Sequence, residues 1–202
     1  MSLAADKPTQ FHDTTLPAGV ARVQPEHAVI LHTAVLGTGT VGRALLSRLQ
    51  ARRDSLDAQF DLREVRNTRR AWRGSDAADV LRELDTPHAA CVPTEFDPDE
   101  LPVAPDAHAL VIDATASAAL AARHAEWLQR GVHVVTASKL AAGGTLTRWQ
   151  ALQEAQRSHA HYGDSATVGA GLPLLSTIRR LRAGGDRIHA IAGTLSGSLA
   201  WL

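Results

Sequence analysis

Several features are scarce in this sequence of 202 residues, and each scarcity excludes a class of protein. Cys91 is the only cysteine, so the chain can form no internal disulfide and no zinc site built from several cysteines. Such cysteine usage fits a reducing compartment. Lys plus Arg and Asp plus Glu number 21 each, and this balance argues against general binding to nucleic acid or anionic membranes. Aromatic residues make up only 4%, which is too sparse for a platform that stacks nucleic-acid bases.

The sequence also lacks a recognisable targeting or membrane-spanning segment. The first twelve residues, MSLAADKPTQFH, have no apolar run of the secretory kind. No stretch approaches the ~20 apolar residues that span a bilayer. We therefore expect a cytoplasmic protein without nucleic-acid or membrane partners. The ten histidines belong to no recognised ligand motif, and we assign them to no metal site.

Strand-like and helix-like segments alternate from residue 28 onward. Residues 1–27 mix Pro, Thr, Asp and His without period, so we expect a disordered leader or linker there. Buried strands are predicted at 28–37, 60–65, 109–115 and 132–137, and helices at 40–53, 75–85, 117–130 and 145–159. Ser75 and Ser117 are expected N-caps, and Gly131 is expected to end a helix. The alternation predicts an α/β fold, with a Rossmann-type doubly wound parallel sheet over 28–164.

The last part of the chain has a different pattern. We expect a strand followed by glycine-rich turns at 166–173, an amphipathic helix at 174–185 and another strand from 187. Residues 165–202 would then begin a second, α+β domain. Its apolar end at Trp201 and Leu202 predicts a domain that is truncated or that leans on a partner. A strand near 188–194 would leave its ladder groups unpaired unless something covered them.

Three glycines in the segment VLGTGTVG, namely Gly37, Gly39 and Gly42, follow the G-x-G-x-x-G spacing between a predicted strand and a predicted helix. Gly37 would permit a tight turn, Gly39 would let the backbone approach a pyrophosphate, and Gly42 would let helix and strand pack closely. The amides of this turn and the helix dipole would hold phosphate charge. The other residues of the turn are Thr38, Thr40 and Val41. The pattern predicts dinucleotide binding, with a glycine-rich turn without ligand as the alternative.

A basic tract after the second predicted strand bears on which dinucleotide is bound. It contains Arg66, Arg69, Arg70 and Arg73. Guanidinium groups pair well with phosphate, so the tract favours the 2′-phosphate of NADP over NAD, with Arg69 and the neighbouring Asn67 as expected contacts. Glu64 is an acidic alternative that would favour NAD. A solvated basic face is the alternative for any single arginine.

Two further strand ends, DATAS (113–117) and TASKL (136–140), border the expected ligand crevice. Lys139 would lie near the nicotinamide, where a lysine can bind a carboxylate, polarise a carbonyl or, once buried, act as an acid or base. An ordinary solvated loop lysine is the alternative. Cys91 lies in a proline-rich connection, and we take it as structural, because a nucleophilic thiol would need activation within the crevice.

Four tracts resemble the homoserine dehydrogenase family, including the dehydrogenase half of the aspartokinase fusions. They are VLGTGTVG, VIDATAS, GVHVVTASKLA and residues 162–202, in the family's order. VGAGLP (168–173) followed shortly by SGSL is specific to that family, whereas the glycine turn is not. The resemblance covers residues 28–202. It implies a homodimeric oxidoreductase that interconverts aspartate 4-semialdehyde and homoserine with NAD(P), on the route to threonine and methionine.

The resemblance also implies roles for individual residues. Lys139 falls on a lysine associated with cofactor and substrate, and Ala114 and Thr115 fall where the family's backbone passes the nicotinamide. Gly197 and Ser198 fall on a tract beside the substrate. A sodium ion is implied at main-chain carbonyls that map to Ser165, Val168, Ala170 and Leu172.

The sequence departs from the family at several points. Ala137, Ser138 and Leu140 stand where the family commonly has Pro, Asn and a second Lys, and Ser165 replaces an acidic residue, with Asp164 one position earlier. The family's substrate-binding acidic residues and proton-transfer lysine lie beyond the part that resembles this chain. Oxidation of an alcohol requires removal of its proton as hydride leaves. We therefore expect a fragment that carries the cofactor half; the alternative is a non-catalytic dinucleotide-binding or assembly module.

Overall fold

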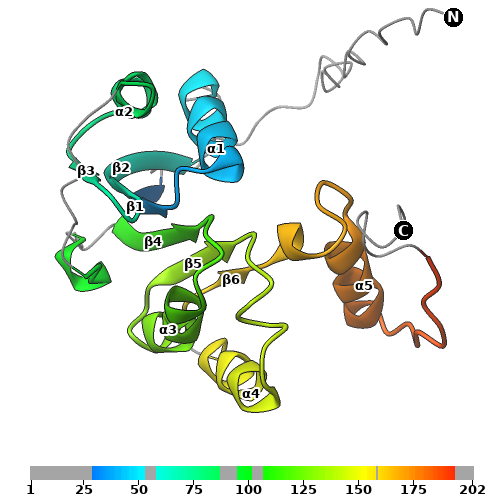
Figure 1. The fold of residues 1–202 in the computed structure, drawn as a ribbon. Coiled ribbons are helices and arrows are strands. Elements are labelled where there is room, and N and C mark those ends of the chain that lie inside the picture. The colour runs from blue at the N-terminus through cyan, green and yellow to red at the C-terminus, as the bar shows by residue number, and fades with distance from the viewer. Residues whose placement is uncertain (1–28, 53–57, 87–94, 102–106, 158, 194–202) are drawn as a thin grey trace, which may run out of the picture.

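The computed structural model describes residues 29–52, 58–86, 95–101, 107–157 and 159–193. Within these residues six strands form one sheet in the order β3-β2-β1-β4-β5-β6 (Figure 1). The strands are β1 Val29–Leu36, β2 Ala58–Arg66, β3 Ala71–Arg73, β4 Ala107–Asp113, β5 His133–Thr136 and β6 Tyr162–Gly163. Neighbouring strands run parallel, apart from β3, which is antiparallel to β2. The predicted α/β class with a mostly parallel, Rossmann-like sheet is confirmed.

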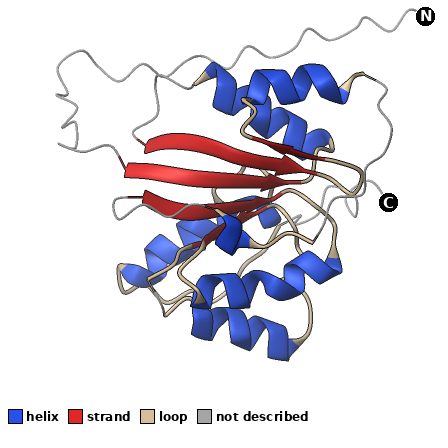
Figure 2. Ribbon diagram, turned by 90° about the vertical axis from the view of Figure 1, so that its left-hand side faces the viewer, coloured by secondary structure: helices blue, strands red, loops and turns tan. Residues whose placement is uncertain are grey.

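Helices cover both faces of this sheet. The covering helices are α1 Thr40–Ala51, α2 Ala77–Leu84, α3 Ala118–Gln129 and α4 Leu146–Ala155. A further helix, α5 Leu174–Ala183, buries none of its residues, and two 3-10 turns are η1 Pro98–Glu100 and η2 Ser165–Thr167. In Figure 1, α1 and α2 lie on one side of the sheet and α3 and α4 on the other. Figure 2, turned by a quarter, shows the strands layered between helices above and below.

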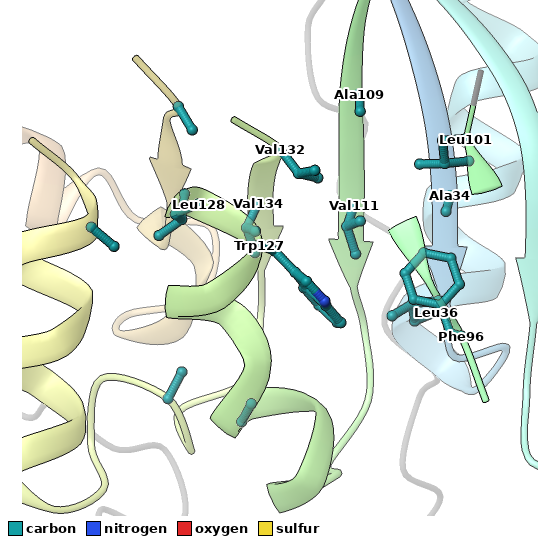
Figure 3. Packing of buried hydrophobic residues seen from close by; sticks show 14 of the residues in the cluster. Ala34, Leu36, Phe96, Leu101, Ala109, Val111, Trp127, Leu128, Val132 and Val134 are labelled. Atoms are coloured by element: carbon teal, nitrogen blue, oxygen red, sulfur yellow. The ribbon is translucent and has the colours of Figure 1, made fainter. Parts of the chain in front are cut away.

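Alternation along the buried strands divides the core into two layers. Successive side chains of a strand point to opposite faces, so Val35 packs in the cluster that contains Leu46 of α1, while Leu36 packs in the cluster that contains Trp127 of α3. Figure 3 shows Trp127 reaching from α3 toward Phe96, and the two rings meet edge to face with centroids 5.7 Å apart. Strands that are apolar on both faces are what a doubly covered parallel sheet requires.

Helix ends follow the predicted capping with one correction. Ser117 caps α3 by accepting a hydrogen bond from the Leu120 amide at 3.3 Å, as predicted, and Gly131 has a φ of 82°. The N-cap of α2 is Asp76 rather than Ser75, because the Asp76 carboxylate accepts from the Asp79 amide at 2.8 Å. Among the described residues, no helix is both long and apolar enough to cross a bilayer.

The fourth helix differs from its predicted extent. It ends at Ala155 instead of 159. Leu146 and Trp149 are 68% and 44% exposed, while Leu152 is buried. The buried residues of this helix are Leu152 and Ala155, near its carboxyl end.

Two strands predicted after residue 165 do not form within the described residues. In place of a strand from 166, the chain makes η2, because the Asp164 carbonyl accepts from both the amide and the hydroxyl of Thr167, at 2.9 and 2.8 Å. Residues 187–193 have no strand structure, since a strand needs a neighbour for its ladder groups and none of the described segments lies beside them. The predictions for 1–27 and Cys91 fall outside the described residues.

Three histidines meet where β4, β5 and β6 begin. The His133 ring stacks on that of His161, with centroids 5.4 Å apart, and meets His108 edge-on at 5.2 Å. His133 Nδ1 also accepts a hydrogen bond from the His161 amide at 2.9 Å. Burial, followed by the nearby His108 and His161, lowers the pKa of His133 below its usual 6.5. In the described part of the chain, no three His, Cys, Asp or Glu side chains are arranged to hold a metal ion.

Stability should therefore fall in mild acid. Because the folded pKa of His133 lies below that of the unfolded chain, the unfolded state binds the proton more readily, and the free energy of unfolding declines as pH drops below 6.5. Urea denaturation at about pH 7.5 and about pH 5 measures this decline. His133→Gln should flatten it, whereas His189→Gln, at an exposed position, should not. Identical pH dependence in wild type and His133→Gln would contradict the explanation.

Candidate functional site

The carboxyl ends of β2, β1 and β4 are tied together at one edge of the sheet. The chain passes from β1 to β2 on one side and later places β4 on the other side of β1. Loops leaving β1 and β4 therefore diverge to opposite faces, which is where open α/β sheets form their ligand crevice. The Gly37 amide donates to the Arg66 carbonyl and the Ala114 amide donates to the Leu36 carbonyl, both at 2.8 Å.

Packing explains two of the three glycines in the turn after β1. Gly37 has a φ of 98°, and a Cβ there would lie 2.8 Å from the Ala114 carbonyl oxygen. A Cβ at Gly42 would lie 1.9 Å from the Gly37 carbonyl oxygen, so α1 could not approach the turn. A Cβ at Gly39 would meet nothing within 4 Å. Gly39 is thus the glycine that internal packing does not require, and it faces open space.

The start of α1 is suited to an anion. Its N-cap is Gly39, which has no side chain to accept hydrogen bonds from the first amides of the helix. No acidic residue lies in the first turn. Amides of a first helical turn lack intrahelical acceptors and carry the positive end of the helix dipole. Thr38, Thr40 and Val41 lie in this turn; Thr40 and Val41 are exposed and Thr38 is half-buried. A phosphate group approaching Gly39 would meet donors without displacing a side chain.

Asn67 links the turn after β1 to the hairpin between β2 and β3. Its amide nitrogen Nδ2 donates to Thr38 Oγ1 at 2.8 Å, and its Oδ1 accepts from the Arg69 and Arg70 amides at 2.8 and 2.9 Å. The Asn67 amide in turn donates to the Arg70 carbonyl at 2.9 Å. A neutral side chain therefore stands directly after β2, and the hairpin tip that carries Arg69 is held beside the glycine turn.

The structure corrects the expectation that the whole basic tract faces a phosphate. Arg66 pairs with Glu64 at 2.6 Å, and Arg73 pairs with the other oxygen of Glu64 at 3.1 Å. Arg73 also pairs with Glu100 at 2.7 Å. These ion pairs occupy the buried Glu64 carboxylate as well, so it is not free to bind ribose hydroxyls, as the acidic alternative required.

Of the remaining two arginines, one is paired within the protein and the other is exposed to solvent. Arg70 pairs with Glu83 of α2 at 2.6 Å and lies over the Trp72 ring at 5.0 Å. Arg69 is exposed, and its guanidinium has no partner among the described residues. Of the tract, Arg69 is thus the arginine available to a ligand at this edge.

A buried carboxylate that the sequence prediction missed organises the loop after β4. Asp113 is fully buried, and its Oδ1 accepts from the amide and the hydroxyl of Thr115 at 2.8 and 2.6 Å. Its Oδ2 faces His124 Nε2 of α3 at 3.0 Å. The Asp113 carbonyl accepts from Thr136 Oγ1 at 3.0 Å and from the Ala137 amide at 3.2 Å. An acidic residue ending an apolar strand was the signal in the sequence that could have indicated it.

Lys139 lies in the loop after β5, beside the loop after β4. The loop is held by backbone bonds, among them the Gly143 amide to the Lys139 carbonyl at 2.7 Å and the Ser138 amide to Thr136 Oγ1 at 2.9 Å. The Lys139 side chain is exposed and its ammonium has no partner among the described residues. The burial that would prepare it as an acid or base is not provided by this part of the chain.

The residues expected around a sodium ion lie between β6 and α5. Ser165 belongs to η2, and Val168, Ala170 and Leu172 follow in an irregular loop. Ala170 has a φ of 50°, the only positive φ of a non-glycine residue in the described ranges. Such strain persists where the surroundings impose it. The Leu172 carbonyl already accepts from the Leu174 amide at 2.8 Å, which leaves it one lone pair for a cation.

The Asp164 carboxylate binds α5 rather than this loop. Both its oxygens bind Arg179 of α5, at 2.7 and 2.8 Å, so the acidic residue before Ser165 anchors a helix. Gly197 and Ser198, expected beside a substrate, lie outside the described residues.

Comparison with known proteins shows what the chain as a whole is similar to. Residues 37–163 match the family model of the homoserine dehydrogenase NAD-binding domain. The chain is 33% identical over 180 residues to bifunctional aspartokinase/homoserine dehydrogenase 2 of Arabidopsis thaliana, covering 85% of this chain and 20% of that protein. It is 31% identical to bifunctional aspartokinase/homoserine dehydrogenase 2 of Escherichia coli (96% of this chain, 24% of that one) and 27% identical to homoserine dehydrogenase of Saccharomyces cerevisiae (86% and 49%).

Solved structures agree on the fold. A Candida auris protein of unknown function gives a TM-score of 0.69 at 26% identity, covering 86% of this chain and 49% of that one. A hyperthermophilic archaeal homoserine dehydrogenase in complex with NADPH gives 0.61 at 21% identity, covering 78% and 50%. This chain thus spans about half, or less, of the proteins it matches.

The glycine turn generates a matched pair of substitutions. Gly42→Ala drives a methyl group into the Gly37 carbonyl and should lower the free energy of unfolding by more than about 2 kcal/mol. Gly39→Ala adds the same methyl group in open space and should change it by less than about 0.5 kcal/mol. Urea denaturation of both variants measures the difference. Equal losses would mean that the close approach of α1 is not what Gly42 serves.

Proposed function

The chain belongs to the homoserine dehydrogenase family, and from that membership we propose that it binds NADP(H) at the carboxyl edge of its sheet. It would supply the cofactor half of an oxidoreductase that interconverts aspartate 4-semialdehyde and homoserine, in threonine and methionine biosynthesis. The observation that carries this proposal is Gly39, a glycine unexplained by packing at the uncapped start of α1. A bound nicotinamide supplies the hydride chemistry, and the residues of this chain bind and orient it.

The pyrophosphate would lie against the turn 37–42. Its amides provide donors and the helix dipole favours its charge. Gly39 leaves the space that a close backbone approach needs, because a Cβ there would have no protein neighbour. Thr38 is oriented by Asn67 and would contribute a hydroxyl at the same place.

A preference for NADP over NAD rests on the end of β2. An acidic side chain there would bind ribose hydroxyls and repel a 2′-phosphate. This chain has the neutral Asn67 at that position, and the nearby Glu64 is occupied by Arg66 and Arg73. Arg69, exposed at the hairpin tip, would meet the 2′-phosphate as a guanidinium–phosphate pair.

The nicotinamide and substrate would lie between the loops after β4 and β5. Ala114 and Thr115 would line the nicotinamide, and Lys139 would bind the substrate carboxylate or polarise its carbonyl. Gly197 and Ser198 are proposed to complete the substrate side. We assign no proton-transfer group to the described residues, because the exposed Lys139 has none of the burial that such a role needs.

Further properties of the family are proposed for the same site and its surroundings. Carbonyls of Ser165, Val168, Ala170 and Leu172 would hold a sodium ion, which suits a loop with two consecutive positive φ values at 169 and 170. A homodimer would form through the second domain, since α5 buries none of its residues and Leu172, Leu181, Ile188 and Ile191 are exposed. A cytoplasmic location stays a prediction.

Binding and turnover should be measured separately on the same folded protein. NADPH binding is measured by its fluorescence, and activity as homoserine-dependent reduction of NADP⁺ in buffer containing sodium or potassium. Turnover would mean that the chain also holds its proton-transfer group. Binding without turnover would support the second candidate, a dinucleotide-binding module, which the exposure of Lys139 favours. Absence of NADPH binding by folded protein would contradict both.

Arg69 should determine the choice between the two cofactors. Arg69→Ala is expected to weaken NADPH binding about tenfold, because one charge-assisted pair with the 2′-phosphate is lost, and to leave NADH binding unchanged. Arg157→Ala, which removes the same charge from an exposed position just after α4, is the control and should affect neither cofactor. Equal weakening of NADPH and NADH in Arg69→Ala would rule out its contact with the 2′-phosphate.

A further inference from the structure

A chain of buried polar groups runs from the loop after β4 through α3 to β6. Asp113 Oδ2 lies 3.0 Å from His124 Nε2, and His124 Nδ1 lies 3.3 Å from the Tyr162 hydroxyl. The side chains of Asp113 and His124 have no exposed surface. None of the roles proposed above uses His124 or Tyr162.

One set of hydrogen-bond directions satisfies every member of this chain of groups. Burial, and then the charges of Asp164 and Asp113, raise the pKa of Tyr162, so its phenol stays protonated and donates. In that set His124 Nδ1 accepts from the Tyr162 hydroxyl and Nε2 donates to the Asp113 carboxylate. Tyr162 therefore selects the tautomer that Asp113 needs.

The other end of the chain reaches the cofactor crevice. Asp113 Oδ1 accepts from both the amide and the hydroxyl of Thr115, and Thr115 Oγ1 accepts from the Ser117 amide at 3.1 Å. The rotation of one carboxylate thus determines the backbone path of residues 113–117. His124 fixes that rotation from the far side of the carboxylate, within α3.

The contribution to stability does not explain why Asp113, His124 and Tyr162 are buried together. Burying polar and charged groups in place of apolar ones of similar volume is often neutral or unfavourable, even when they are paired. An apolar side chain at 124 would meet Trp127, whose ring centroid is 5.5 Å from that of His124, and would extend the core. Buried polar networks of this kind instead specify one geometry.

We propose that Asp113, His124 and Tyr162 form a positioning relay that holds the Thr115 loop in the shape that receives the nicotinamide end of the dinucleotide. His124 is a positioning residue, which acts through Asp113 without touching the cofactor. This inference rests on the proposed binding of NADP(H) at the same edge. It predicts an effect on one half of the cofactor only, because the adenosine half contacts the glycine turn and the Arg69 hairpin.

Two ligands distinguish an effect on the nicotinamide half of the cofactor from an effect on the adenosine half. They are NADPH and adenosine 2′,5′-bisphosphate, which lacks the nicotinamide. Calorimetry should show that His124→Leu weakens NADPH about tenfold, as expected for loss of a hydrogen bond to a buried carboxylate, while the bisphosphate binds within about twofold of wild type. His124→Gln, whose Nε2 can donate to Asp113, should recover NADPH affinity to within about threefold of wild type.

Tyr162→Phe keeps the shape of the core and removes only the hydroxyl. It should weaken NADPH about threefold and spare the bisphosphate, and it provides the test if His124→Leu does not fold. Equal weakening of both ligands, or unchanged NADPH binding in folded His124→Leu and Tyr162→Phe, would overturn the relay. Wild-type protein that binds both ligands equally would also overturn it, since there would be no nicotinamide contact to position. Wild-type protein that binds neither would instead contradict the proposed function.

Discussion

A carboxylate buried at the end of a strand must have its oxygens satisfied by hydrogen bonds, and the partners of Asp113 join the loops after β4 and β5 to α3. Its side chain holds Thr115 and faces His124, and its carbonyl holds Thr136 and Ala137. The neighbouring Ala114 in turn donates to the end of β1 and restricts Gly37. Removing the partner of a buried charge lowers stability by far more than the net contribution of the pair suggests. The arrangement at this edge of the sheet therefore depends on Asp113.

The residues on the two sides of the proposed crevice differ in how firmly the described part of the chain holds them. On the side proposed to bind phosphate, the glycine turn, Asn67 and Arg69 form a connected surface whose parts are fixed by short backbone and side-chain bonds. On the other side, Lys139 is exposed and α5 is attached largely through the pair between Asp164 and Arg179, without a buried residue of its own.

The sequence predicted the features that arise from local pattern. Apolar strands, helical periodicity and the glycine spacing each reflect constraints within a few residues, so the sheet class, the turn before α1 and the Ser117 cap could be predicted. Features set by distant partners could not. Arg73 and Arg70 pair with Glu100 and Glu83, which lie outside the basic tract, so the tract itself does not reveal that these arginines are occupied. The strand expected from 187 failed for the same reason, because strands depend on neighbours that sequence pattern does not supply.

The most direct measurement of where the cofactor binds is a titration of ¹⁵N-labelled protein with NADPH, followed by amide chemical shifts. We expect the largest changes at residues 38–42, 67–69 and 114–116, which come from three separate segments that meet at the carboxyl edge of the sheet. Smaller changes should extend through 124, and the amides near His108, His133 and His161 at the opposite edge should not move. Changes centred on those histidines, or none at saturating NADPH, would contradict a dinucleotide site at the glycine turn.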